Sequence, residues 1–197
     1  MEFQHLSRVY IIGAPGAGKG SLCTKLAADY GFYHLSIGDL LRKQAEVGDL
    51  RPDIIRAIQH SALLETEDLV PIIEHAIEEL SKAGKQRLLI DGVPRSVQQI
   101  GAIEGAVGSP DLVLFFDCPE GLAKHRFLTR HLPGRSDDID TFNARYTHYV
   151  RQNVQIVAHY QEKGLLVTVD TSGSVNSSYA KLLDALRSTE NPAHNEL

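Results

Sequence analysis

The chain has 197 residues, 43% of them hydrophobic and 23% charged, and its formal net charge at pH 7 is −5. This composition is that of an ordinary globular domain and excludes a disordered or fibrous chain. The negative balance argues against nonspecific nucleic-acid binding, which needs a basic face, and no apolar run approaches the ~18 residues of a membrane-spanning helix.

Five short apolar runs predict strands, at residues 9–12, 32–35, 87–90, 112–116 and 165–169. Near-continuous apolar runs are typical of parallel strands that helices cover on both faces. Helical patterns alternate with them, at residues 22–30, 38–45, 53–64, 68–83, 97–104, 121–130, 139–162 and 177–186. The alternation predicts an α/β fold with a doubly wound parallel sheet, in which ligands bind at the carboxyl edge of the strands. Pro52 suits a first helical turn, and we expect Asp68 to cap the helix that Gly84 ends.

A glycine-rich turn separates the first predicted strand from the first predicted helix. It consists of Gly13, Ala14, Pro15, Gly16, Ala17, Gly18, Lys19, Gly20 and Ser21. Glycines let the backbone approach an anion closely, and the amides at the helix start then point at it. Lys19 adds a mobile positive charge for the outer phosphates of a nucleoside triphosphate. The usual motif has Ser or Thr directly after the Lys, whereas Gly20 intervenes here. Because strand and helix flank it, we favour a phosphate-binding loop over a glycine-rich surface turn.

The segment SIGDLLR, residues 36–42, follows the second predicted strand. Arg42 lies one helical turn beyond Asp39, from where it can reach a bound phosphate. The alternative is an ordinary helix start, which Ser36 or Asp39 caps and on which Arg42 is solvated. The residues alone leave both interpretations open.

The segment DGVPR, residues 91–95, follows the third predicted strand. An aspartate at this place, Asp91, can face the phosphate loop and orient water around a magnesium ion. Gly92 and Pro94 make a sharp turn, after which Arg95 can offer its fork of donors to phosphate oxygens. A simple Asp-Gly turn is the alternative, and the nearby phosphate loop favours the functional interpretation.

Arginines concentrate around the segment GRSDD, residues 134–138, and they are Arg126, Arg130, Arg135 and Arg145. Arg126 and Arg130 lie four residues apart on one helix face, where like charges repel by roughly a few tenths of a kcal/mol. A bound anion is a natural reason for keeping them together. The alternative is a solvated basic patch that the neighbouring aspartates balance.

Two cysteines, Cys23 and Cys118, form no CxxC pair, and no H-E-x-x-H pattern occurs. We therefore expect no direct metal ligand and two buried free thiols, which suit a reducing compartment. The first predicted strand begins at Val9 and leaves no room for a signal peptide. A cytoplasmic protein with neither a nucleic-acid nor a membrane partner is the expectation.

The four segments GAPGAGKGS, SIGDLLR, DGVPR and GRSDD occur in the order and spacing of the nucleoside monophosphate kinases. Over roughly residues 8–186 the chain resembles this family, with adenylate kinase and UMP/CMP kinase as the most similar types. The resemblance implies a P-loop NTPase fold with a five-stranded parallel sheet flanked by helices. It also implies a core of residues 1–35, 66–129 and 141–197, a helical NMP-binding insertion at 36–65, and a short lid at 130–140.

The resemblance implies reversible transfer of the γ-phosphoryl group of Mg-ATP to a nucleoside monophosphate. Mg²⁺ is then the cofactor, small-molecule nucleotides are the partners, and a monomer is expected. Gln99 matches the glutamine that reads adenine, so AMP is the expected acceptor. Ile37 stands where adenylate kinases usually carry Thr and UMP/CMP kinases Ala, and residues 61–65 read SALLE in place of a pattern closer to GQLVP. A UMP/CMP kinase and a catalytically weak, nucleotide-binding regulatory domain therefore remain alternatives.

The resemblance assigns roles residue by residue. The catalytic set is Lys19, Arg95, Arg130, Arg135 and Arg145. The ATP-binding set is residues 13–21 with Arg126, Arg130 and Gly173. The NMP-binding set is Ile37, Arg42, Leu64, Gly92, Arg95, Gln99, Arg135 and Arg145. Asp137 and Asp138 match an acidic pair that orients the arginines, and Asp91 is expected to meet the metal only through water.

Overall fold

The computed structural model of the chain describes residues 2–48, 50–60, 62–130 and 137–190. Within them, five strands form one parallel sheet in the order β2-β3-β1-β4-β5. The strands are β1 (Arg8–Gly13), β2 (Tyr33–Ser36), β3 (Leu88–Asp91), β4 (Leu112–Asp117) and β5 (Leu166–Asp170). The expected α/β fold and parallel sheet are confirmed, and every predicted strand is present.

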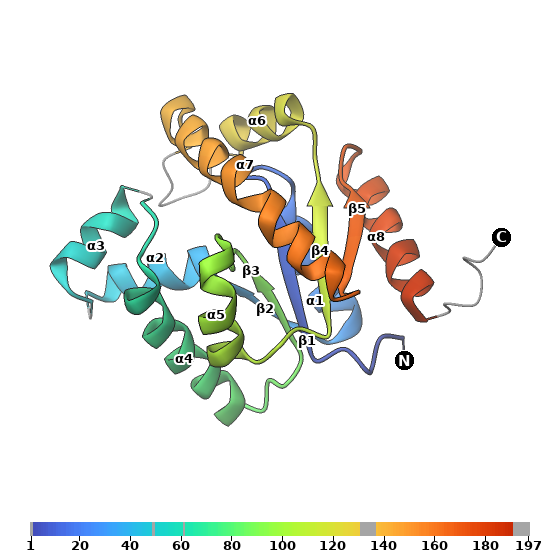
Figure 1. Cartoon of the computed structure of the whole chain (residues 1–197), viewed down its shortest axis with the longest axis horizontal. Coiled ribbons are helices and arrows are strands. Elements are labelled where there is room, and N and C mark those ends of the chain that lie inside the picture. The colour runs from blue at the N-terminus through green and yellow to red at the C-terminus, as the bar shows by residue number, and fades with distance from the viewer. Residues whose placement is uncertain (1, 49, 61, 131–136, 191–197) are drawn as a thin grey trace.

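Helices cover both faces of this sheet (Figure 1). Helices α1 (Lys19–Tyr30) and α8 (Val175–Glu190) pack on one face, and α4 (Thr66–Lys82), α5 (Ile100–Val107) and α7 (Ile139–Glu162) pack on the other. A short 3₁₀ turn, η1 (Val97–Gln99), precedes α5, and α6 (Glu120–Thr129) follows β4. Helices α2 (Ile37–Val47) and α3 (Pro52–Gln59) lie at the end of the molecule opposite α8 (Figure 1).

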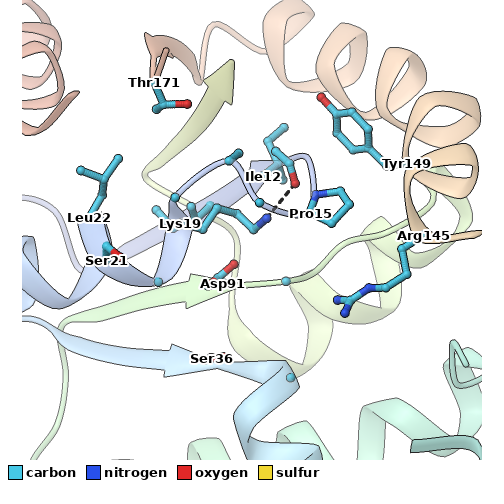
Figure 2. Close-up of a pocket in the computed structure, with 18 of the residues that line it drawn as sticks. Ile12, Pro15, Lys19, Ser21, Leu22, Ser36, Asp91, Arg145, Tyr149 and Thr171 are labelled. Carbon is cyan, nitrogen blue, oxygen red and sulfur yellow. Dashed lines mark hydrogen bonds between the residues drawn. The ribbon is translucent and has the colours of Figure 1, made fainter. Parts of the chain in front are cut away.

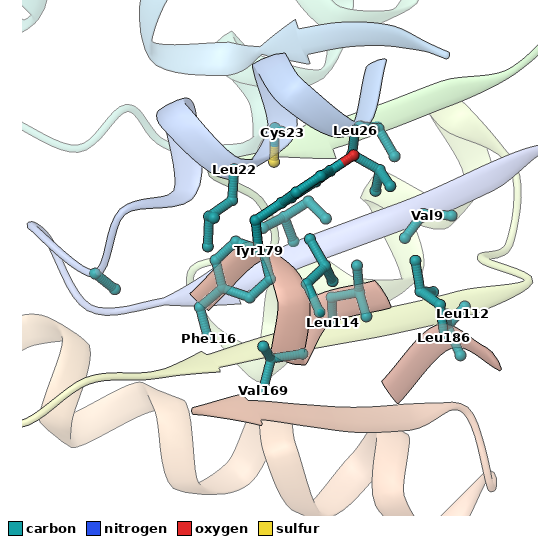
Figure 3. Packing of buried hydrophobic residues seen from close by; sticks show 14 of the residues in the cluster. Val9, Leu22, Cys23, Leu26, Leu112, Leu114, Phe116, Val169, Tyr179 and Leu186 are labelled. Atoms are coloured by element: carbon teal, nitrogen blue, oxygen red, sulfur yellow. The ribbon is translucent and has the colours of Figure 1, made fainter. Parts of the chain in front are cut away.

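The central strands β1, β3 and β4 are mostly apolar because both of their faces are buried. Val9 and Ile11 of β1 face the cluster that α1 and α8 complete, while Tyr10 and Ile12 face the cluster of α4, α5 and α7. This is the period-two alternation of a strand with a core on each side. Figure 3 shows Tyr179 among the aliphatic side chains of the first cluster, and its hydroxyl donates to Asp29 Oδ2 over 2.6 Å.

Cys23 and Cys118 are both buried free thiols, as expected. No helix in the described part of the chain combines the length and the apolar character that crossing a bilayer requires. Two residues named above lie outside the described residues: Arg135, which has a predicted catalytic role, and Ser61, which has a predicted pocket position. Most of the expected lid lies outside them as well.

Some predicted helix ends are wrong. Helix α3 ends at Gln59 instead of residue 64, and Leu63 and Leu64 line cavities beside α2. Helix α4 begins at Thr66 with Glu65 as its N-cap, so Asp68 lies inside the first turn, where its carboxylate meets Arg51 over 2.9 Å. The signal at Pro52 is confirmed, and Gly84 follows Ala83, the C-cap of α4, with a positive φ of 72°.

The sheet order places the ends of three strands together. β1 lies between β3 and β4, with Ile11 beside Asp91 and Gly13 beside Phe116. The connection from β1 passes through α1 on one face, while the connection from β3 passes through α5 on the other. The loop after β1 therefore lies at a topological switch point, where α/β sheets bind their ligands.

Candidate active site

The loop between β1 and α1 has the geometry of an anion site. Gly18 is the N-cap of α1 with φ of 91°, a left-handed conformation that favours glycine, and no side chain caps the helix. The first turn of α1 contains no acidic residue. A Cβ on Gly16 would stand 2.0 Å from the carbonyl oxygen of Ala123, so only glycine fits this backbone against α6. Backbone amides without a side-chain cap and the positive end of the helix dipole favour a phosphate here.

Lys19 turns back over this loop. Its Nζ donates to the carbonyl oxygens of Gly13 over 2.8 Å and Ala14 over 2.9 Å. Burial lowers the pKa of Lys19 to about 8, while the Asp91 carboxylate acts to raise it and Arg145 and Arg95 lower it further. Figure 2 shows Lys19 and Asp91 in the same cleft, into which Arg145 and Tyr149 project from α7. Burial makes the charged form of this ammonium group unfavourable. The negative charge of a bound phosphate would offset that penalty.

One cavity of about 1290 Å³ joins the loop to the predicted arginines. It exceeds the ~300–1,000 Å³ of a typical small-molecule pocket. The arginines that line it are Arg42, Arg95, Arg126, Arg130 and Arg145. Other predicted site residues also line the cavity, and they are Gly13, Pro15, Gly16, Ala17, Gly18, Lys19, Gly20, Ser21, Gly92 and Gly173. Ala14 has its side chain in the core instead and offers its carbonyl oxygen to Lys19.

Arg42 lies on the α2 side of the cavity. Ser36 is the N-cap of α2, because its Oγ accepts a hydrogen bond from the Asp39 amide over 3.3 Å. The Arg42 guanidinium pairs with the Asp39 carboxylate one turn away. Ser36 thus caps an ordinary helix start, as one interpretation expected. Arg42 nevertheless lines the cavity, as the other interpretation expected.

Arg95 is fixed by its own turn. Its Nε donates to the Gly92 carbonyl oxygen over 2.7 Å, and its backbone amide donates to Gln99 Oε1 over 2.8 Å. Burial lowers the pKa of the Arg95 guanidinium, although Asp91 acts to raise it. These two bonds hold the Arg95 guanidinium in place. Its other N–H groups are therefore suited to donate to a charged phosphate oxygen.

Asp91 ends β3 beside the loop and is 8% exposed. His34 Nε2 lies 3.6 Å from Asp91 Oδ2. The described part of the chain contains no cluster of three or more His, Cys, Asp or Glu side chains that would hold a metal directly.

Arg126 connects α6 to the loop that follows β5. Its guanidinium donates to the carbonyl oxygen of Thr171 over 2.7 Å and to that of Gly173. A weaker contact of 3.6 Å joins it to Cys118 Sγ. The predicted pair of Arg126 and Gly173 is therefore brought together on one wall of the cavity.

Arg130 meets Asp137, one of the two acids expected to orient arginines. Its Nε donates to Asp137 Oδ2 over 2.9 Å, and a second guanidinium nitrogen bonds the other carboxylate oxygen. The same guanidinium lies 4.1 Å from the ring centre of Phe127, and that of Arg145 lies 5.8 Å from it. Asp138 has a different contact: it caps α7 by accepting from the Thr141 amide over 2.7 Å, and that bond lowers its pKa.

A smaller pocket of about 20 Å³ adjoins the cavity beside α2. The predicted residues Ile37, Leu64 and Gln99 line it, and its further side chains include Leu41, Leu69 and Val93. Ile37 is 1% exposed and Gln99 is 8% exposed. Gln99 and Arg95 are therefore the polar side chains of a largely apolar pocket.

A row of residues on α7 was not predicted from the sequence. His148, Tyr149, Gln152 and Ile156 line the cavity beside the predicted Arg145. They follow Arg145 at intervals of three, four, seven and eleven, which is the spacing of one helix face. That spacing from a predicted arginine is the signal that could have revealed them.

Comparison with known proteins agrees with this geometry. The adenylate kinase family model matches residues 11–165. The uridylate kinase of Saccharomyces cerevisiae is 36% identical over 186 residues, which cover 92% of this chain and 91% of that protein. Adenylate kinase isoenzyme 1 of Caenorhabditis elegans is 38% identical, over 87% of this chain and 83% of its own length.

UMP-CMP kinase 2 of Oryza sativa subsp. japonica is 34% identical over 90% of this chain and 74% of its own length. The similar proteins thus include kinases named for uridylate, for adenylate and for both pyrimidine monophosphates. A phosphate loop at the switch point, arginines around one large cavity and these matches lead to one assignment. The chain belongs to the adenylate kinase family and is a nucleoside monophosphate kinase.

Proposed function

We propose that this kinase transfers the γ-phosphoryl group of Mg-ATP to AMP, reversibly. The supporting observation is that one cavity is lined by the phosphate loop and also by Arg42 and Arg95, with Arg130 and Arg145 along the same space. The loop suits the triphosphate, and the arginines beside α2 suit the monophosphate. Such an arrangement holds donor and acceptor phosphates close to one another, which is what in-line transfer requires.

The reaction needs positive charge and alignment more than a general base. The phosphate of a nucleoside monophosphate has a second pKa near ~6 and is largely dianionic at neutral pH. We propose that Lys19, Arg130 and Arg145 stabilise the charge of the transferred group, and that Arg95 orients the acceptor. Asp137 supports this by fixing the Arg130 guanidinium through two bonds. Preorganised charge of this kind acts in the transition state.

Mg²⁺ fits the residues that are present. Asp91 offers a buried carboxylate beside the phosphate loop, in the cavity that Lys19 and Ser21 also line. We propose that Asp91 holds the ion through bound water while the phosphates supply direct ligands. The ion would supply charge neutralisation on the phosphate oxygens.

We propose that residues 36–65 form an NMP-binding insertion and that residues 130–140 form a lid. Helices α2 and α3 lie at one end of the molecule (Figure 1), and Arg42 of α2 lines the cavity, which supports the first assignment. Closure of a lid would exclude water and so protect the donor from hydrolysis. A cytoplasmic location and a monomeric state stay predictions.

AMP is our proposed acceptor because Gln99 matches the glutamine that reads adenine in the family that the chain resembles. Its Oε1 accepts from the Arg95 backbone amide, and this bond leaves the NH₂ group to donate to a bound base. The ring nitrogens of adenine can accept from it, as can the carbonyl oxygens of uracil and cytosine. A UMP or CMP acceptor is the second candidate: Ile37 offers no hydrogen bond to either base class, and similar proteins bear the names uridylate kinase and UMP-CMP kinase.

Initial rates with Mg-ATP and a panel of AMP, UMP, CMP and GMP test this proposal. We expect the highest kcat/KM for AMP. A higher value for UMP or CMP would assign the pyrimidine alternative. Absence of transfer to all four acceptors would overturn the proposed reaction and favour a regulatory nucleotide-binding role.

A further inference from the structure

His148 connects two arginine-bearing parts of the active site. Its Nε2 lies 3.1 Å from the carbonyl oxygen of Arg95, which is 53 residues earlier in the chain. A carbonyl oxygen only accepts, so Nε2 carries the proton and donates. The ring belongs to α7 and lines the main cavity.

The bond from His148 is a third hydrogen bond that holds the turn around Arg95 in place. The Arg95 amide is held by Gln99 and its Nε by the Gly92 carbonyl oxygen. Both of those partners belong to the same turn, within four residues of Arg95. His148 therefore supplies an anchor from a separate element, α7, to the half-buried Arg95.

The same helix face carries Arg145. It lies three residues before His148, and side chains at this spacing are neighbours on a helix. Figure 2 shows Arg145 and Tyr149 projecting from α7 into the cleft that Asp91 also lines. A bond from His148 to Arg95 thus fixes the Arg95 turn relative to the helix that presents Arg145.

We propose that His148 is a positioning residue for phosphoryl transfer, which sets the spacing between Arg95 and Arg145 through its bond to the Arg95 carbonyl. This inference rests on the proposed function, in which Arg95 holds the acceptor phosphate and Arg145 acts on the transferred group. A misplacement of about 1 Å can cost 10²-fold in rate without removing any contact to substrate. The expected defect is therefore in turnover.

The test compares His148→Leu, which removes the donor, with His148→Gln, whose amide can still donate to the carbonyl. We expect His148→Leu to lower kcat by about 10- to 100-fold, with KM for ATP within about twofold because His148 has no contact with Lys19 or Arg126 among the described interactions. His148→Gln should restore kcat to within about threefold of wild type. His148→Met serves in place of the Leu variant if that variant does not fold.

His159→Leu is the matched control. His159 is on the same helix, packs at 5.0 Å against the Tyr160 ring and does not line the cavity. We expect it to change Tm and leave kcat within about twofold. The proposal is overturned if His148→Leu keeps wild-type kcat, or if His148→Gln loses as much turnover as His148→Leu. A wild-type protein without phosphotransfer would instead refute the proposed function.

Discussion

Asp91 and Lys19 act on each other across the phosphate loop. Burial lowers the pKa of Lys19 to about 8, and the Asp91 carboxylate is the largest influence that raises it. Asp91 occupies this place because β3 is the neighbour of β1 in the sheet, with Asp91 beside Ile11. The lysine that is expected to bind phosphate therefore loses its proton close to physiological pH in the free protein.

A pH dependence follows from that relationship. As the pH rises through about 8, Lys19 loses the charge that attracts the triphosphate. We expect kcat/KM for Mg-ATP to fall above that pH, since this parameter reports the free enzyme. A bound phosphate raises the pKa of Lys19, so kcat should fall only at higher pH. Initial rates between pH 6 and 10 measure both profiles, and a kcat/KM that stays level to pH 9.5 would be inconsistent with this account.

Replacement of Lys19 by Met separates catalysis from stability. We expect Lys19→Met to lower kcat/KM by at least about 10²-fold, because a preorganised cation is lost. Its Tm at pH 7 should be no lower than that of wild type, because the lowered pKa shows that the charged form is costly to bury. Lys82→Met, which removes an exposed helix lysine paired with Glu78 and Glu79, is the control and should keep wild-type rates. Near-wild-type activity of Lys19→Met would refute the role of Lys19.

Asp137→Asn tests the support of Arg130. The carboxylate accepts two bonds from the guanidinium, and an amide offers one acceptor where the arginine needs two. We expect kcat to fall about tenfold while KM for ATP changes little, because Arg130 loses its fixed orientation. Asp140→Asn alters an exposed carboxylate three residues away and should leave kcat unchanged. Equal rates for the two variants would show that Asp137 is dispensable.

Substitutions of Gln99 test base recognition. Gln99→Leu removes both the partner of the Arg95 amide and the NH₂ donor, whereas Gln99→Glu keeps an acceptor for that amide. We expect both variants to raise KM for AMP by about tenfold with a smaller change in kcat, as for a uniform binding contact. If Gln99→Glu has wild-type AMP kinetics while Gln99→Leu does not, Gln99 supports the Arg95 turn and does not read the base.

Much of the fold could be predicted because the local and long-range signals agree. The strand runs are apolar on both faces, as Tyr10 and Ile11 show by entering opposite clusters. The phosphate loop could be recognised because Gly18 and Lys19 occur between a strand and a helix. The end of α3 could not, since the apolar residues after Gln59 continue a helical pattern. Their place around a pocket that α2 and η1 also line is a tertiary effect that no local pattern encodes.

The cationic residues of the site could be predicted from the sequence, but the hydrogen bonds that hold them in place could be predicted less well. Arginine clustering indicated an anion site, but not that Arg126 bonds the Thr171 and Gly173 carbonyls or that Asp138 caps α7. His148 was missed because an amphipathic helix pattern does not say which polar face meets a cavity. Its bond to Arg95 depends on the placement of α7 over the end of β3, which is a property of the whole fold.

Titration with a dinucleoside pentaphosphate tests the central claim that one cavity receives both nucleotides. The adenosine form carries two nucleosides on one phosphate chain and should span the loop and the Arg42 side together. We expect one molecule to bind per chain by calorimetry, at least about 10²-fold more tightly than ATP, as for an analogue of the transition state. It should compete with ATP and with the acceptor. Binding of two molecules per chain, or competition with only one of the two nucleotides, would contradict the account.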